Sequence, residues 1–289
     1  GHELAGTVAE VGPEVTRWNV GDRVTVPFVC GCGRCELCLA GDAQVCPDQT
    51  QPGFTGPGSF AERVAINAAD ANLVGLPDAV GFVTAASLGC RFATAFRAVV
   101  AHGLLQSGQV LAVHGCGGVG LSAVMIGAAL GAEVVAVDVS EAARERAREL
   151  GAAYVIDASG NHDTAATIHD LTGGAHVSID ALGSSATAVA SVGSLRRRGR
   201  HVQVGLLLGD AATPPLPMDR VVAHELEVHG SHGMAAHEYP AMLALVEDGT
   251  LRPDLLVGSV IGLDGAGAAL AAMDHPPTSP GMTVVEIGR

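Results

Sequence analysis

The chain has 289 residues, 48% of them hydrophobic, and its 30 acidic residues outnumber 16 basic ones, which gives a net charge of −14. This length predicts about two domains, with a core that needs no disulfide bonds. The hydrophobic content excludes intrinsic disorder. The negative charge argues against a nucleic-acid partner, because phosphate binding needs a basic surface.

The first part of the chain, residues 1 to about 75, is predicted to form a small β-rich domain. Short alternating runs at 4–11 and 23–29 indicate strands, and glycine-containing turns separate them. The chain begins Gly-His-Glu, without an initiator Met, a basic region or an apolar region. We therefore expect no secretory signal, and a chain that is either processed or truncated.

From about residue 92 the pattern changes to alternating strands and helices. Helices are predicted at 121–130 and 141–150, with Ser140 as the N-cap of the second and Gly131 and Gly151 beyond their carboxyl ends. The remaining predictions are strands at 109–114, 133–138, 154–156, 177–180, 200–204, 226–230 and 283–287, and helices at 186–196 and 239–247. The six strands up to residue 230 predict an α/β fold with a doubly wound parallel sheet.

The stretch 102–132 contains no Asp, Glu, Lys or Arg, which is long enough for a membrane span. Its many glycines, its glutamines and its serines favour a buried strand, a turn and a buried helix instead. We expect no membrane partner. Six of the seven cysteines lie before residue 91, which favours a metal site in a reducing compartment, with the cytoplasm as the default.

The cysteine motif has the spacing Cys-x2-Cys-x2-Cys-x7-Cys and predicts a structural zinc site, because four thiolates can close a tetrahedron around the metal. A ferredoxin-type cluster also uses two x2 gaps and a following Pro, here Pro47, but its last gap has three residues instead of seven. Unligated thiols are the third interpretation, and Cys30, outside the pattern, is expected to be a buried apolar side chain. The predicted ligands are Cys32, Cys35, Cys38 and Cys46.

A glycine-rich loop follows a predicted strand and opens a predicted helix, the context of a dinucleotide pyrophosphate site. Asp138 ends the next strand, where its carboxylate can accept the ribose hydroxyls and repel a 2′-phosphate. We therefore predict NAD over NADP, with Arg144 as the main reservation, and a glycine-rich packing turn as the alternative. The predicted loop residues are Gly115, Gly117, Gly118, Val119 and Gly120.

The chain resembles the zinc-dependent medium-chain alcohol dehydrogenases over essentially all 289 residues. The resemblance rests on Gly-His-Glu, Val-Gly-Asp-Arg-Val at 20–24, the cysteine motif, Leu-Gly-Cys at 88–90, the glycine loop and Asp138. It implies a six-stranded Rossmann sheet plus a β-rich, GroES-like catalytic domain truncated at its N-terminus. The implied domains are a catalytic domain at 1–92 with the zinc lobe at 30–47, an NAD-binding domain at 93–229, and a return to the catalytic domain at 230–289.

The resemblance also implies roles for single residues, which composition alone does not assign. Taken by themselves, His2 would be an ordinary polar residue and Cys90 a core thiol. In the family they correspond to ligands of a catalytic zinc, and Glu3 to a carboxylate behind the metal that can exchange with a ligand. The residues implied to contact the nicotinamide are Thr94, Val204, Gly205 and Leu206.

Two positions depart from the family pattern. The family's first catalytic-zinc ligand, a Cys, and its first strands precede Gly-His-Glu, and Ala143 stands where a Lys is common. The arginines at 196–198 with Arg200 are expected at a solvated helix end, and His229, His232 and His237 are expected to be scattered polar residues. The arginines and these histidines predict no further site.

The implied activity is interconversion of an alcohol and its aldehyde or ketone, with zinc and NAD, in a homodimer or homotetramer. Two alternatives remain: a catalytically incomplete zinc- and nucleotide-binding fragment, and a zinc-free reductase of the quinone-reductase type. The sequence does not identify the alcohol.

Overall fold

The computed structural model describes residues 1–160, 163–274 and 281–288. The chain forms two compact units, one of Gly1–Ala93 with His232–Arg289 and one of Thr94–Ser231. Residues 275–280 and 289, which belong to the predicted C-terminal segment, lie outside the described ranges.

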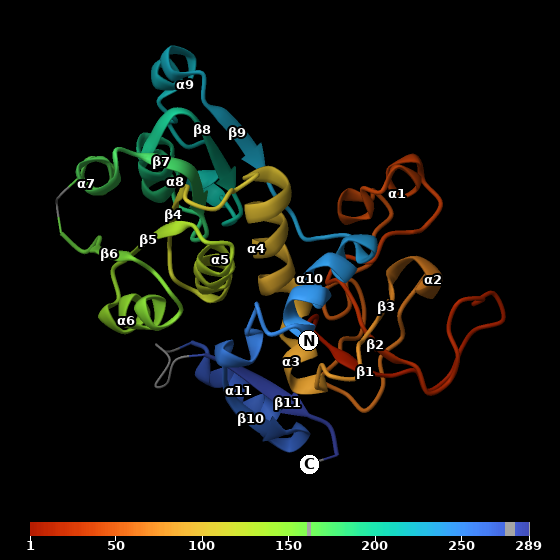
Figure 1. Ribbon diagram of the computed structural model, residues 1–289. Helices are drawn as coiled ribbons and strands as arrows, with labels where there is room; N and C mark the ends of the chain where they lie inside the picture. Colours follow the sequence, from red (N-terminus) through yellow and green to blue (C-terminus); the bar gives the residue numbers. More distant parts are fainter. Residues whose placement is uncertain (161–162, 275–280, 289) are drawn as a thin grey trace. The chain divides into compact units, whose positions relative to one another are not determined.

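The second unit is built on a six-stranded sheet in the order β6-β5-β4-β7-β8-β9, and every pairing in it is parallel (Figure 1). All five residues of the central strand β4 are buried, as expected for an apolar strand covered on both faces. The strands are β4 Val110–His114, β5 Glu133–Asp138, β6 Tyr154–Asp157, β7 Ala175–Asp180, β8 Leu195–Gln203 and β9 Glu227–Gly230. The predicted doubly wound parallel sheet is confirmed.

Helices cover both faces of this sheet. On one face Gly127 lies close to Leu111, which leaves no room for a larger side chain between α5 and the sheet. On the other face Ile168 and Val192 join the buried cluster around Val110. The helices of this unit include α5 Gly118–Ala129, α6 Glu141–Glu149, α7 Thr164–Thr172, α8 Ser185–Gly193 and α9 Met218–His224.

The start of α6 follows the sequence prediction closely. The Ser140 side chain accepts a hydrogen bond from Ala143 N, so it caps the helix as predicted. Gly131 and Gly151 follow the ends of α5 and α6 with φ of +78° and +105°, a region that glycine adopts without a steric cost.

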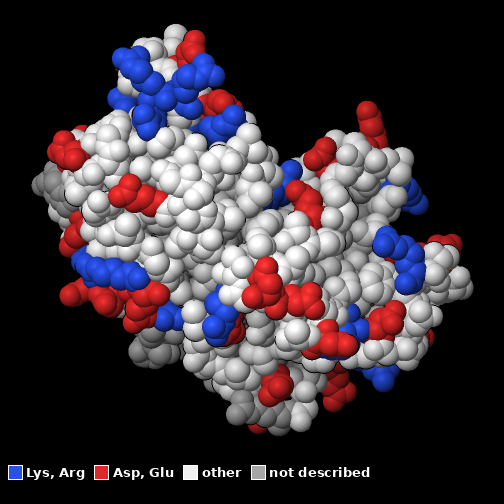
Figure 2. Space-filling model, viewed as in Figure 1, with Lys and Arg blue, Asp and Glu red and all other residues white. Residues whose placement is uncertain are grey.

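The helix predicted at 186–196 is shorter in the structure, where α8 spans Ser185–Gly193. It ends at Gly193, because Leu195 already pairs with Ala175 in the sheet. The arginines at 196–198 therefore lie at the start of β8, not at a helix end, and the register shifts there before Arg200 pairs with Val177. Arg side chains gather at the α9 end of this unit in Figure 2, and the sequence contains no Lys.

The first unit contains a three-stranded antiparallel sheet of β1 Ala5–Thr7, β2 Arg23–Thr25 and β3 Val74–Gly75. These strands are much shorter than the predicted runs at 4–11 and 23–29: β1 ends at Thr7, and β2 ends at Thr25, two residues before Pro27, which has no backbone N–H to donate to a ladder. The other elements used below are α1 Glu36–Ala40, α2 Ala69–Asn72, α3 Phe82–Ala86, α4 Ala93–Arg97, α10 Tyr239–Glu247, α11 Ala266–Ala272, and the parallel pair β10 Val257–Gly262 and β11 Met282–Glu286.

The uncharged stretch 102–132 forms β4 and α5 together with their connections. Across the described ranges, no helix has the length and apolar composition that crossing a membrane requires.

Candidate functional site

The four motif cysteines come together in one group, with all their Sγ atoms within 4.8 Å of one another. The Sγ atoms of Cys32 and Cys38 are 4.0 Å apart, and those of Cys35 and Cys46 are 3.7 Å apart. Sulfurs at about 2.3 Å from a tetrahedral zinc lie about 3.8 Å from one another. The sulfur positions therefore fit a zinc ion with four protein ligands and no open position.

Backbone N–H groups point at these sulfurs. Cys35 N donates to Cys32 Sγ at 3.3 Å, and Cys38 N donates to Cys35 Sγ at 3.5 Å. Backbone N–H groups of Arg34 and Cys35 lower the pKa of Cys32 to about 6, because they stabilise the thiolate that a metal needs. Cys30 lies outside the group, where burial raises its pKa to about 12, as expected for an apolar role.

A cradle for a pyrophosphate lies at the carboxyl end of β4. Gly115 has φ of +91°, and a Cβ on Gly120 would overlap the Gly115 carbonyl, so helix α5 begins directly against the turn. A Cβ on Gly117 would meet nothing within 4 Å, so the space before the first turn of α5 is open. The positive end of a twelve-residue helix faces this space, which suits an anion.

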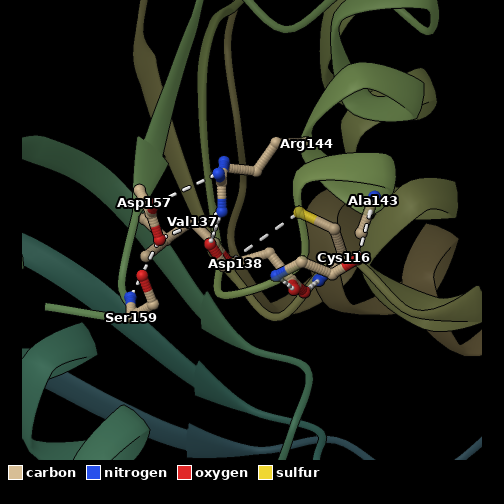
Figure 3. A network of polar contacts seen from close by, with 8 residues as sticks. Cys116, Val137, Asp138, Ala143, Arg144, Asp157 and Ser159 are labelled. Atoms are coloured by element: carbon tan, nitrogen blue, oxygen red, sulfur yellow. Dashed lines mark hydrogen bonds and ion pairs between the residues drawn. The ribbon is translucent and has the colours of Figure 1, made fainter.

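The carboxylate of Asp138 lies beside the same loop, at the end of β5 (Figure 3). It accepts hydrogen bonds from Cys116 N at 2.6 Å and from Ser140 N at 2.8 Å. Arg144 is the residue that could favour NADP. It donates to the Asp138 carbonyl at 2.9 Å and forms an ion pair with Asp157 at 3.0 Å. Because these partners already hold its guanidinium, Arg144 is poorly placed to neutralise a 2′-phosphate.

The segments carrying His2 and Cys90 are neighbours in the first unit. A Cβ on Gly89 would lie 3.8 Å from the His2 carbonyl oxygen and 3.5 Å from Glu3 Cα. The His2 ring contacts two aromatic rings, with centroid distances of 5.9 Å to Phe28 and 4.9 Å to Phe54. Burial lowers the pKa of His2, which favours the neutral imidazole that binds metals.

The Glu3 carboxylate is held by Arg91, the residue after Cys90. Arg91 donates from Nη2 to Glu3 Oε2 at 2.5 Å and from Nε to the same oxygen at 3.1 Å, and its backbone N donates to Oε1 at 3.2 Å. The Glu3 side chain is 12% exposed. Such a charge-assisted fork fixes the carboxylate in one orientation.

The predicted ligands His2 and Cys90 belong to no group of three or more potential metal ligands among the described residues. In the described part of the chain, the cysteine group is the one set of three or more His, Cys, Asp or Glu side chains close enough to share a metal. His229 pairs with Glu227, and His232 contacts the Gln44 carbonyl. Thr94 is buried in the second unit, and 204–206 follows the end of β8.

Sequence reasoning missed Arg91, Asp180 and Gln203. Arg91 pairs with a residue 88 positions away, for which no local pattern exists. Asp180 offered a signal, because a carboxylate at the end of a buried strand is costly unless hydrogen-bond donors surround it.

Comparisons with known proteins agree with this geometry. Residues 1–78 match the alcohol dehydrogenase GroES-like domain, and residues 118–248 match the zinc-binding dehydrogenase family. An alcohol dehydrogenase of Geobacillus stearothermophilus is 36% identical over 80% of this chain and 67% of its own length. An NAD-dependent alcohol dehydrogenase of Sulfurisphaera tokodaii is 31% identical over 95% of this chain and 78% of its own.

Among solved structures, the alcohol dehydrogenase TADH from Thermus sp. ATN1 superposes with a TM-score of 0.90 at 29% identity, over 99% of this chain and 84% of that one. The fold, the cysteine group and the glycine loop with Asp138 are thus those of a zinc-binding oxidoreductase of the dinucleotide-dependent class. The chain belongs to the medium-chain zinc-dependent alcohol dehydrogenase family. Zinc and NAD are the cofactors that this membership supports.

Proposed function

We propose that the protein oxidises a primary or secondary alcohol to its aldehyde or ketone and passes the hydride to NAD. The observation that carries this proposal is the edge of the parallel sheet, where an open glycine loop and a carboxylate lie on adjacent strands. That arrangement suits a dinucleotide with a free ribose 2′-hydroxyl. The relatives described as alcohol dehydrogenases support the alcohol as the reduced substrate.

In this proposal the second unit binds the cofactor. The loop Gly115–Gly120 and the start of α5 hold the pyrophosphate through backbone N–H groups, and Asp138 accepts the ribose hydroxyls. The nicotinamide end then lies over the strands on the other side of β4, because the ligand crosses the sheet where the strand order reverses. Its partners there are Thr94, Val204, Gly205 and Leu206.

In the first unit, His2 and Cys90 contribute ligands to a catalytic zinc. A bound zinc supplies Lewis acidity that lowers the pKa of the alcohol. The chain's own contribution is to bring together the segments that carry the His2 imidazole and the Cys90 thiol, with the His2 ring packed against Phe28 and Phe54. The ion pair of Glu3 with Arg91 links the residues that follow His2 and Cys90, and so orients these two proposed zinc ligands.

The cysteine lobe has a structural role in the same unit. We further propose that the protein acts in the cytoplasm as a homodimer or homotetramer, as expected of this family.

The proposal is tested by metal counting together with cofactor reduction. Zinc-supplemented protein is assayed with NAD and with NADP against primary and secondary alcohols, alongside Cys90→Ala and Cys38→Ser. We expect NAD reduction that Cys90→Ala abolishes while the lobe zinc stays bound. Lobe zinc and NADH binding without turnover would favour the incomplete fragment, and turnover without zinc would favour a quinone-type reductase.

A further inference from the structure

The carboxyl ends of β7 and β8 are joined by a buried polar cluster that the proposed function has not yet used. Its central members are Asp180 at the end of β7 and Gln203 at the end of β8, which are register partners. Asp180 is 0% exposed. Burying a carboxylate is costly unless its oxygens receive hydrogen bonds, so the position of its donors indicates what the residue holds in place.

Among the described residues, the donors to Asp180 come from the connections beyond the strands and from Gln203. Its Oδ1 accepts from Leu182 N and from Gly183 N, each at 3.0 Å. Its Oδ2 accepts from Gln203 Nε2 at 2.9 Å, and its backbone carbonyl accepts from Gly205 N at 2.8 Å. The carboxylate thus fixes the turn after β7 and, through the amide, the turn after β8.

Gln203 completes the link by holding the second turn directly. Its Nε2 also donates to the Gly205 carbonyl at 2.8 Å. The amide orientation is set from the other side, where His201 Nε2 lies 3.3 Å from Gln203 Oε1. His201 Nδ1 in turn lies 2.8 Å from Ser191 Oγ on α8, so a neutral His201 can donate to Gln203 and accept from Ser191.

The two turns pack backbone to backbone. A Cβ on Gly183 would overlap the Leu206 carbonyl, and a Cβ on Gly205 would overlap Gly183 N. With no side chain between them, a shift of one turn moves the other. The turn that contains Gly205 is the one proposed to contact the nicotinamide.

We propose that Asp180 and Gln203 are positioning residues, a clamp that presets the turns after β7 and β8 for the nicotinamide end of the cofactor. This inference rests on the proposed function, because it assumes that a nicotinamide dinucleotide binds at this edge. Asp180 and Gln203 bond to the two turns and not to Asp138, although Leu182 of the first turn lies against Gly115 of the glycine loop. Loss of the clamp should therefore weaken binding of the nicotinamide half of the cofactor more than that of the adenosine half.

The experiment compares two ligands that differ only by the nicotinamide. Equilibrium dissociation constants for NADH and for ADP-ribose are measured on the wild type, Gln203→Met and Asp180→Asn, with thermal unfolding of each. Ser178→Ala is the matched control, since Ser178 lies in the same buried cluster and bonds to Ser191 without touching either turn. We expect both clamp variants to weaken NADH about tenfold and ADP-ribose less than about twofold.

Equal weakening of the two ligands, or an NADH constant that changes no more than in Ser178→Ala, would overturn the clamp. If one clamp variant fails to fold, the other is measured alone. Asp180→Asn is the more conservative of the two, because the amide keeps the size of the side chain. A wild type that binds neither ligand would instead refute the proposed function, so the two failures are distinguishable.

Discussion

The buried histidine at the end of β4 predicts a specific loss of stability in mild acid. His114 is 1% exposed, and its Nε2 has no hydrogen-bond partner in the described structure. Burial lowers its pKa to about 4, a shift that Asp180 opposes and His201 reinforces. In the unfolded chain the same group has its ordinary pKa near 6.5.

The sign of the effect follows from proton binding. Below about pH 6.5 His114 binds a proton in the unfolded chain, whereas in the folded chain it stays neutral down to about pH 4. The free energy of unfolding therefore falls as the pH falls through that window. When the pH is lowered from about 7.5 to about 5.5, the titration of His114 reduces the free energy of unfolding by about 1.3 kcal/mol. His201, with its pKa also lowered to about 4 by burial, adds a similar amount.

The perturbation is His114→Leu, which removes the titration and replaces the imidazole, with its unpaired buried nitrogen, by an apolar side chain of similar volume. We expect the variant to be more stable than the wild type at neutral pH by about 1 kcal/mol, because the substitution removes a buried polar atom that has no hydrogen-bond partner. Its advantage should grow by about 1.3 kcal/mol at about pH 5.5.

Urea unfolding of both proteins at the two pH values measures these differences. The neutral measurement is the control, because it reports packing without titration. An advantage that is the same at both pH values would refute the argument that His114 stays neutral in the folded protein.

The remaining predictions concern the metal lobe and the cofactor. Cys35→Ser or Cys38→Ser should release the zinc, unfold residues 30–47 locally and lower the melting temperature, and metal analysis with calorimetry checks this; normal melting without bound zinc would contradict the site. Asn72→Ala should destabilise the same lobe by about 1–3 kcal/mol, because the buried Asn72 exchanges 2.9 Å hydrogen bonds with both backbone groups of Gly31; unchanged zinc retention under chelator would argue against that support. Asp138→Ala should weaken NAD and reduce discrimination against NADP, and an unchanged preference in parallel titrations would remove Asp138 from the ribose site.

The parts of the site that the sequence predicts are those that depend on local chemistry. The cysteine spacing places four sulfurs on one short lobe, and the glycine loop needs only its strand and helix on either side. The parallel sheet follows from near-continuous apolar strands alternating with helices. Ser140 acts as a cap because its partner lies three residues away.

The parts that the sequence does not predict depend on residues far apart in the chain. Glu3 and Arg91 meet only after the first unit has folded, and Asp180 and Gln203 meet only because β7 and β8 are neighbours in register. The helix end at Gly193 is set by sheet pairing of Leu195, which a helical pattern running on to Arg196 conceals. Tertiary pairing, in each case, decides what local preference leaves open.

The central claim is that hydride passes from an alcohol carbon to NAD on this chain. It is tested most directly by supplying zinc-loaded protein with NAD and an alcohol that carries deuterium on the carbon bearing the hydroxyl. The account predicts deuterium on the nicotinamide ring of the NADH formed, with no label in the Cys90→Ala reaction. Absence of label in the nicotinamide from every primary and secondary alcohol, in protein that binds NADH and zinc, would contradict it.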